Sequence, residues 1–244
     1  MDPEVPLVVP EVNPQAILKH KGIIANPNCS TIIMVMALKP IYELSRIKRV
    51  IVSTYQAVSG AGKEGIDELD NQVREHSEGR EMIANILPSA SAEKHYPIAF
   101  NLIPQIDVFC DNLYTKEEMK MINETKKIME DNEMRITATT IRVPVYRSHS
   151  ESVNIELEQD VDLDVMRAAL AKFPGVTVQD DPASQEYPMP LYTSEKDDVY
   201  VGRLRKDESC DKSYNLWVVG DQIRKGAALN TLQIAETMIK NGWI

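Results

Sequence analysis

The order of apolar and polar residues divides the chain into predicted helices and strands. An almost unbroken apolar run after an Asn-Pro-Asn turn predicts a buried helix over residues 30–42. Thr115, followed by glutamates in the first turn and lysines later, predicts a capped helix over 115–131. Helical spacing of apolar residues predicts three more helices, over 63–87, 162–173 and 224–243.

Strands are predicted where β-branched residues gather. These segments are 46–60, 135–147, 151–161, 199–207 and 213–221, with a short strand and turn over 22–28. Residues 1–18 place prolines between short apolar runs and are expected to run extended over a surface. Long strands interleaved with helices predict an α+β fold, built around a mixed or antiparallel sheet flanked by helices.

Composition and charge narrow the class of protein. The chain has 244 residues, 43% hydrophobic and 26% charged, which is ordinary for a globular protein with one large domain. A formal net charge of −10 argues against nucleic acid and anionic membranes as partners. No apolar segment is long enough to span a membrane, and the acidic, proline-broken start does not resemble a signal peptide. A cytoplasmic protein is expected.

The three cysteines are too widely spaced for a disulfide framework or a metal site. Cys29 stands out because it lies at the predicted start of a helix, where the helix dipole and free N–H groups lower a thiol pKa. A small buried hydrophobic residue is an equally good interpretation, and the local sequence leaves both open. Cys110 is expected in the core and Cys210 at the surface.

A thiolate nucleophile needs a proton donor or base, and His149 is the one histidine of four in a suggestive position. It lies in a polar Ser-His-Ser break between two predicted strands, although a loop histidine is more often structural. Arg142 lies seven residues earlier, an odd separation that puts the two side chains on opposite faces of a straight strand. The chain must bend at Pro144 and the Ser-His-Ser turn for both to line one site.

Two further motifs are weak by themselves. Residues 59–65 contain a literal G-x-G-x-x-G, but no suitably spaced acidic residue ends a following strand, so a glycine loop that approaches a ligand is the better interpretation. Glu117 and Lys120 are three residues apart on one predicted helix, and an exposed ion pair is the plain interpretation.

Together these motifs resemble one family along nearly the whole chain. In this order, the chain looks like a bacterial-type aspartate-semialdehyde dehydrogenase through the segments GIIANPNCSTI, VSTYQAVSGAGKEG, HYPIAFNLIPQID, EEMKMINETKKIM, RVPVYRSHSESV and VGDQIRKGAALNTLQIAE. The resemblance implies a catalytic domain like that of glyceraldehyde-phosphate dehydrogenase. It also implies the reduction of L-4-aspartyl phosphate to L-aspartate 4-semialdehyde by NADPH, a step in lysine, threonine and methionine biosynthesis that includes the diaminopimelate route.

The resemblance also assigns roles to residues. Cys29 is expected to hold the acyl group as a thioester, with His149 as general acid/base and Gln56 positioning the intermediate. The substrate is expected to meet Arg142 with its α-carboxylate, Glu117 with its amine and Lys120 with its phosphate. NADP is expected to contact Ser59, Gly60, Gln222 and Asn230. No metal is expected, and the family forms homodimers.

The family further implies a division of the chain. Residues 1–28 are expected to be the residual end of a nucleotide-binding domain, 29–219 the catalytic and dimerisation domain, and 220–244 a helix that packs on the nucleotide-binding domain. The Rossmann half is expected to be missing, so that the chain is a truncated form, inactive in redox chemistry alone. Two alternatives stay open: a substrate-binding dimerisation module without redox activity, and a related acyl-phosphate reductase such as N-acetyl-glutamyl-phosphate reductase.

Overall fold

A six-stranded mixed sheet forms the centre of the computed structural model, which describes residues 2–244. The strand order is β2-β1-β3-β6-β5-β4; β1 and β2 are parallel, as are β4 and β5, and the other neighbours are antiparallel. The strands are β1 (Ile47–Gln56), β2 (Arg135–Arg142), β3 (His149–Leu157), β4 (Val176–Val178), β5 (Val199–Lys206) and β6 (Ser213–Gly220). The predicted α+β class and mixed sheet are confirmed.

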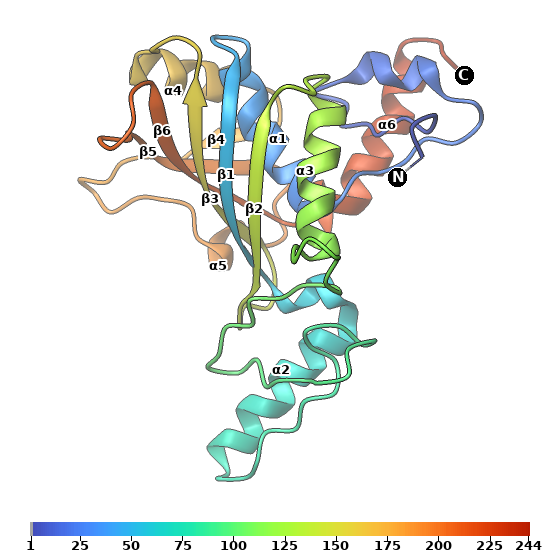
Figure 1. Cartoon of the computed structure of the whole chain (residues 1–244), viewed down its shortest axis with the longest axis vertical. Coiled ribbons are helices and arrows are strands. Elements are labelled where there is room, and N and C mark those ends of the chain that lie inside the picture. The colour runs from blue at the N-terminus through green and yellow to red at the C-terminus, as the bar shows by residue number, and fades with distance from the viewer. Residues whose placement is uncertain (1) are drawn as a thin grey trace.

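Three helices pack against one face of this sheet (Figure 1): α1 (Cys29–Tyr42), α3 (Lys116–Ile128) and α4 (Leu163–Lys172). Helix α1 lies at the centre, and the side chains from Ile32 to Leu38 are fully buried. It therefore lacks the polar face of a surface helix, as its apolar sequence predicts. The predicted cap at Thr115 is confirmed, and it is a capping box, because the side chains of Thr115 and Glu118 each accept a hydrogen bond from the other's backbone N–H.

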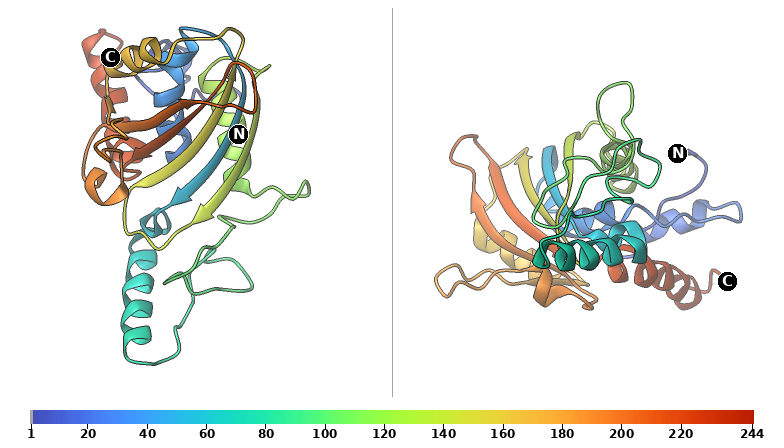
Figure 2. Two further views of the ribbon diagram at one scale, coloured as in Figure 1. Left: turned by 90° about the vertical axis from the view of Figure 1, so that its left-hand side faces the viewer. Right: turned by 90° about the horizontal axis from the view of Figure 1, so that it is seen from below.

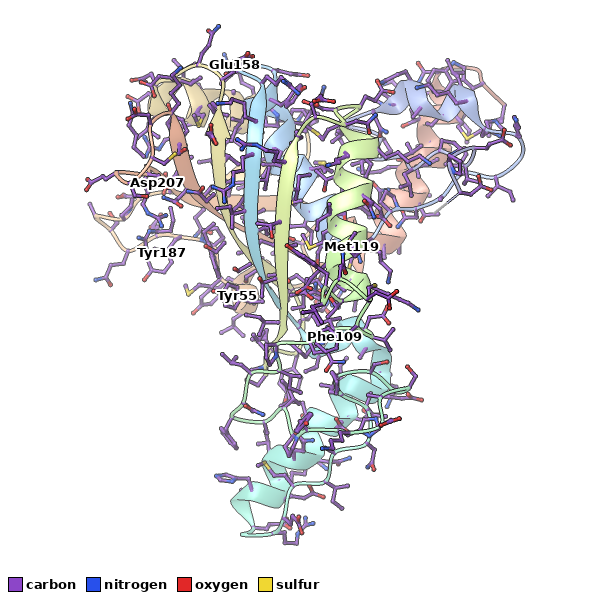
Figure 3. All side chains as sticks on the ribbon, in the orientation of Figure 1. Tyr55, Phe109, Met119, Glu158, Tyr187 and Asp207 are labelled. Carbon is purple, nitrogen blue, oxygen red and sulfur yellow. The ribbon has the colours of Figure 1, made fainter. Side chains whose placement is uncertain are left out.

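The opposite face of the sheet carries half-buried aromatic and polar side chains. Tyr55 from β1 and Trp217 from β6 lie with ring centroids 5.6 Å apart. A hollow of 290 Å³ beside Trp217 is also lined by Arg203 and Arg205. Tyr55 lies near the end of β1 from which residues 62–114 project (Figure 3).

An arm made of α2 (Gly62–Ser77) and the irregular segment 78–114 projects from the end of the sheet (Figures 1 and 2). Gln72, fully buried on α2, accepts hydrogen bonds from the N–H groups of Ile98 and Ala99 and donates to the carbonyl of Ile83. The arm has its own small apolar core. The predicted helix over 63–87 is thus correct for its first half and wrong beyond Ser77.

Residues 2–28, called the strap below, pack with α6 (Leu229–Lys240) beside α1. The strap includes the 3-10 helix η1 (Pro14–Lys19) and buries Val8 and Ile17 against Ile234 of α6. The expectation of an extended surface segment is therefore wrong for its apolar residues. Lys225, fully buried just before α6, pairs with Glu11 of the strap, Nζ to Oε2 2.5 Å.

Other departures concern short elements. The strand expected over 22–28 is only a single bridge between Leu7 and Ala25. Strand β4 and the helix α5 (Pro190–Thr193) were not predicted. The 3-10 turn η2 (Val58–Ala61) replaces the end of the predicted strand over 46–60. The helix predicted over 224–243 begins with the π-helical turn η3 (Arg224–Ala228) and continues as α6. The predicted pair of strands over 199–207 and 213–221 is confirmed as β5 and β6. The described residues, 2–244, contain no helix with the length and apolarity of a membrane span.

Candidate active site

Cys29 is the first residue of α1. Asn28 caps the helix, because its side-chain oxygen accepts a hydrogen bond from the Thr31 N–H at 3.0 Å. The turn before the helix is fixed further by Glu124, which accepts from the Asn28 N–H at 2.7 Å. The direction of the Cys29 side chain is therefore set by a cap on one side and a carboxylate on the other.

The thiol does not have the lowered pKa that its helix position suggests. Burial is the main cause that raises the pKa of Cys29 to about 12, and the Glu117 carboxylate raises it further. Arg142 acts in the opposite direction, but it is outweighed. The helix-dipole argument fails here because desolvation of a thiolate costs more than a helix terminus returns. In this state Cys29 is a protonated thiol at neutral pH.

The ends of β1 and β2 and the start of β3 lie together near Cys29. Gln56 is the last residue of β1 and lies opposite Arg142, the last residue of β2, in the parallel ladder. His149 is the first residue of β3, which runs antiparallel to β1. The expected polar break between two strands is therefore shorter than predicted, because His149 is already the first residue of β3. The bend expected near Pro144 does bring Arg142 and His149 together.

The peptide groups of Ala57 connect these side chains. The Ala57 N–H donates to Nδ1 of His149 at 3.0 Å, and the Ala57 carbonyl accepts from Nη1 of Arg142 at 2.7 Å. A methyl group on Gly60 would lie 2.6 Å from Nη1 of Arg142 and 3.2 Å from Cε1 of His149. A larger residue at position 60 would therefore displace the Arg142 guanidinium, whereas glycine lets both side chains pack against the turn.

Burial governs the charges of this cluster. It lowers the pKa of His149 well below its ordinary value, and the nearby Arg142 cation lowers it further, so the ring is neutral at pH 7. Nε2 of His149 and Nε of Arg142 are both buried without a hydrogen-bond partner among residues 2–244. Such buried polar atoms are costly and are typical of a site that awaits a ligand.

Glu117 joins the helix side of the site to the sheet side. Its Oε1 accepts from Nδ2 of Asn28 at 2.8 Å and from Nε2 of Gln56 at 3.3 Å, while Oε2 lies 3.5 Å from Nζ of Lys120. The plain interpretation of an exposed Glu117–Lys120 pair is wrong, because Glu117 is buried. Lys120 also lies 3.4 Å from Asp107. Burial acts to lower the pKa of Lys120, but Glu117 and Asp107 outweigh it and raise the pKa.

A pocket of 300 Å³ lies between the arm and α3; Arg142, Glu117 and Lys120 line it, whereas Cys29, Gln56 and His149 do not. Its volume suits a small-molecule ligand. Five of its twelve lining residues are charged: Glu64, Asp107, Glu117, Lys120 and Arg142.

The residues expected to bind a cofactor are divided by the structure. Ser59 and Gln222 are hydrogen-bonded to each other, and Gln222 also accepts from the Ser148 N–H at 3.0 Å, so both lie beside His149. Asn230 lies apart from them. It is fully buried, and its amide donates to the Val8 carbonyl at 2.9 Å and to Asn26 at 2.8 Å. Both amide hydrogens are used within the chain, which argues against the expected cofactor contact.

Comparison with known proteins places this chain in a family. Residues 38–225 match the family model described as "Semialdehyde dehydrogenase, dimerisation domain". An aspartate-semialdehyde dehydrogenase from Aquifex aeolicus is 54% identical over 100% of this chain and 71% of its own length. The chain belongs to the aspartate-semialdehyde dehydrogenase family.

Solved structures of this family agree with the fold. Aspartate semialdehyde dehydrogenase II from Vibrio cholerae, complexed with ASA, has a TM-score of 0.91 and 46% identity over 98% of this chain and 69% of its own. An aspartate semialdehyde dehydrogenase from Candida albicans, solved with NADP, has a TM-score of 0.72 and 25% identity over 99% of this chain and 68% of its own. The chain thus spans about 70% of the length of these dehydrogenases.

Several contributors to the site were not predicted. The backbone of Ala57 and the close packing of Gly226 against Cys29 act through main-chain atoms or the absence of a side chain, which no residue pattern reveals. Asn28 was interpreted only as part of a turn, although its amide reaches Glu117. Asp107 lies in an irregular segment far from Lys120 in sequence, so only the fold brings the two together. Cys110 is half-buried rather than in the core, whereas Cys210 is exposed as expected.

Proposed function

We propose that this chain carries the chemistry of aspartate-semialdehyde dehydrogenase: reduction of L-4-aspartyl phosphate to L-aspartate 4-semialdehyde, by way of a thioester on Cys29. The family membership supports the reaction class. The single observation that carries the proposal is the cluster in which Cys29, at the start of α1, shares one charged site with Arg142, His149 and Glu117.

Three charged groups match the three charged parts of the substrate. Arg142 has a buried, unpartnered Nε, and a planar guanidinium binds a carboxylate in bidentate fashion, so it is assigned to the α-carboxylate. Glu117 is assigned to the substrate ammonium, because its carboxylate is buried and already lies 3.5 Å from a cation. Lys120, half-exposed at the pocket, is assigned to the phosphate.

The acyl-transfer step forms one bond and breaks another. The sulfur of Cys29 attacks the acyl carbon, and the carbon–oxygen bond to phosphate breaks with Lys120 neutralising the leaving group. Gln56 is assigned to positioning the intermediate through Glu117, because its amide donates to the Glu117 carboxylate at 3.3 Å. His149 faces the developing oxyanion as the acid/base group, and backbone N–H groups at the start of α1 assist it.

The residues present fit one end of a nicotinamide cofactor. The Gly60 backbone is exposed and lies directly against His149, whose Nε2 has no partner within residues 2–244. Ser59, Gly60 and Gln222 are the residues that would hold the nicotinamide end. NADPH, when bound, supplies the hydride that reduces the thioester to a thiohemiacetal.

The proposal also assigns domain roles, a partner and a biosynthetic pathway. We assign residues 29–219 to catalysis and dimerisation, and the strap with residues 220–244 to contacts with a nucleotide-binding domain. The half-buried face that carries Tyr55 and Trp217 is suited to a second copy of the chain. The proposed product belongs to the biosynthesis of lysine, threonine and methionine.

The acyl-transfer step can be tested without the cofactor. After incubation with L-4-aspartyl phosphate, intact-protein mass spectrometry should show one aspartyl adduct, and peptide mapping should place it on Cys29. Cys29→Ala should abolish the adduct and Cys110→Ala should not. An adduct on Cys110, or none on a folded wild-type chain, would overturn the proposal.

A further inference from the structure

Lys225 is a buried charged residue that the proposed reaction does not use. It lies in η3, just before α6, and its side chain is fully buried. Its ammonium donates to Oε2 of Glu11 at 2.5 Å, to Oε1 of Gln233 at 2.7 Å and to Oδ1 of Asn230 at 3.2 Å. An ammonium group has three hydrogens, so all of its donors are used. One buried group thus fixes η3, α6 and the strap relative to one another.

Stability is a weak reason for this arrangement. Burial lowers the pKa of Lys225, which means that the charged form is costly here, and Glu11 offsets only part of that cost. Replacing a buried ion pair by apolar residues is often neutral or stabilising, whereas removing one partner is strongly destabilising. The benefit of the pair must then lie in the geometry that it imposes on its neighbours.

The neighbour that depends on this geometry is Cys29. Gly226 follows Lys225 directly in η3, and a methyl group on Gly226 would lie 3.0 Å from Cβ of Cys29. Carbon atoms in ordinary contact are about 3.5–4.0 Å apart, so the backbone of η3 already packs tightly against the first residue of α1. π-helical turns are rare, and those that occur are frequently at functional sites. Adjacent residues of this turn contact the strap on one side and the nucleophile on the other.

We propose that Lys225 is a positioning residue, whose ammonium ties η3 to the strap and so holds Gly226 against Cys29 in the arrangement that acylation requires. The proposal deepens the role of Cys29 and rests on the proposed function for the identity of the acyl donor. Lys225 is fully buried and is not among the residues that line the pocket beside Arg142, so it makes no contact with the substrate. Its loss should slow the chemical step and leave substrate binding unchanged.

Lys225→Met tests this separation, because it removes the charge and keeps most of the side-chain length. The rate of Cys29 acylation at saturating L-4-aspartyl phosphate should fall on the order of tenfold, since a shift of about 1 Å in a reacting group costs about a hundredfold and a smaller shift costs less. The concentration that gives half of this rate should not change, since the groups assigned to the substrate are untouched. An unchanged maximal rate in the folded variant would overturn the proposal.

Alkylation by iodoacetamide reports on Cys29 without any substrate. Burial is the main cause of the raised pKa of this thiol, so separating η3 from α1 should admit water, lower the pKa and speed the alkylation. Cys110, half-buried in the arm, is the internal control and should react at the wild-type rate. Alkylation that speeds up equally at both cysteines would assign Lys225 a role in stability only and would overturn the proposal.

Lys127→Met is the matched control for loosening the strap. Lys127 also fastens the strap, but it does so from α3, through hydrogen bonds from its ammonium to three strap carbonyls. This variant should acylate Cys29 at the wild-type rate. A loss equal to that of Lys225→Met would show that any loosening of the strap slows the reaction, and would overturn the specific role of Lys225.

Glu11 tests the ion pair from its other side. Glu11→Asp keeps the charge but shortens the side chain by one methylene, so the Lys225 ammonium must shift to keep its partner and acylation should slow. Wild-type acylation by a folded Glu11→Asp variant would overturn the proposal even where Lys225→Met does not fold. The double variant Glu11→Gln with Lys225→Met should be no slower than Lys225→Met alone, because residues that act as one unit are not additive. An additive loss would contradict the pair.

The two readouts separate failure of this inference from failure of the proposed function. Suppose that the wild-type chain forms no aspartyl adduct, yet Cys29 is alkylated faster in Lys225→Met while Cys110 is unchanged. That result would refute the function and leave the positioning of Cys29 intact. An adduct that forms equally fast in the wild type and in folded Lys225→Met would refute the inference alone.

Discussion

Gly226 offers a sharp test of how closely the nucleophile is positioned. It lies in η3, fully buried against the first turn of α1. A methyl group on this residue would lie 3.0 Å from Cβ and 3.3 Å from Cα of Cys29. Gly226 is not among the glycines with positive φ, so an alanine meets no backbone strain and the effect of Gly226→Ala is purely steric.

The size of the effect follows from the distance. Carbon atoms in contact are about 3.5–4.0 Å apart, so Cys29 and η3 must separate by a few tenths of an ångström. A displacement of about 1 Å in a reacting group costs on the order of a hundredfold in rate. Alanine also favours a helical backbone by up to about 1 kcal/mol over glycine, which offsets part of the steric cost in stability. The smaller shift expected here should therefore slow acylation on the order of tenfold, with little change in the free energy of unfolding.

The assay is the rate of adduct formation on Cys29 with L-4-aspartyl phosphate, followed by mass spectrometry beside a urea unfolding curve. Ala228→Ser is the matched control, because Ala228 lies in the same turn with its side chain exposed. Wild-type acylation by a folded Gly226→Ala variant would refute the claim that this contact positions the thiol.

Two charge substitutions test the electrostatics around Cys29 and of the buried carboxylate on β3. Because Glu117 raises the pKa of Cys29, Glu117→Gln should lower that pKa and speed alkylation of Cys29 by iodoacetamide by up to about tenfold at fixed pH, as read by mass spectrometry. Glu130→Gln, which changes an exposed carboxylate just beyond the end of α3, should leave the rate unchanged; slower alkylation of Glu117→Gln would contradict the assignment. Glu151 is fully buried with no partner for either oxygen within residues 2–244, and burial raises its pKa well above the ordinary value. The protonated Glu151 stabilises the fold fully below the unfolded-state pKa of about 4.3, and this contribution is lost as the pH rises through the folded-state pKa. Glu151→Gln should therefore be more stable to urea than the wild type at about pH 7.5 and should differ little from it near pH 4. A larger advantage at low pH would reverse the sign of this argument.

The apolar pattern predicted the core elements well because burial leaves a periodic signature. Helix α1 and strands β5 and β6 each follow from runs of residues whose side chains must leave water. The end of α2 could not be predicted, since Gln72 pins the irregular segment after Ser77 through backbone contacts that carry no sequence pattern. The order of the strands in the sheet could not be predicted either, because the sequence does not show that β1 pairs with both β2 and β3.

The candidate site shows the same division. Side chains with distinctive chemistry, such as Cys29 and His149, could be named from the sequence and the family resemblance. The protonation states could not, because the Cys29 pKa depends on how far burial and Glu117 outweigh Arg142. Asn230 shows the converse: a polar side chain next to a family motif is used to fasten the strap at Val8 and Asn26.

The strand ladder carries a consequence for how this chain can change in evolution. Gln56 and Arg142 face each other only because β1 and β2 pair in one register, and β3 is aligned with β1 in the same way. Adding or deleting one residue within these strands would turn every following side chain to the opposite face. Length variation among descendants should therefore collect in the irregular half of the arm, between 78 and 102, while the three strands keep their residue count as faithfully as the reacting groups keep their identity.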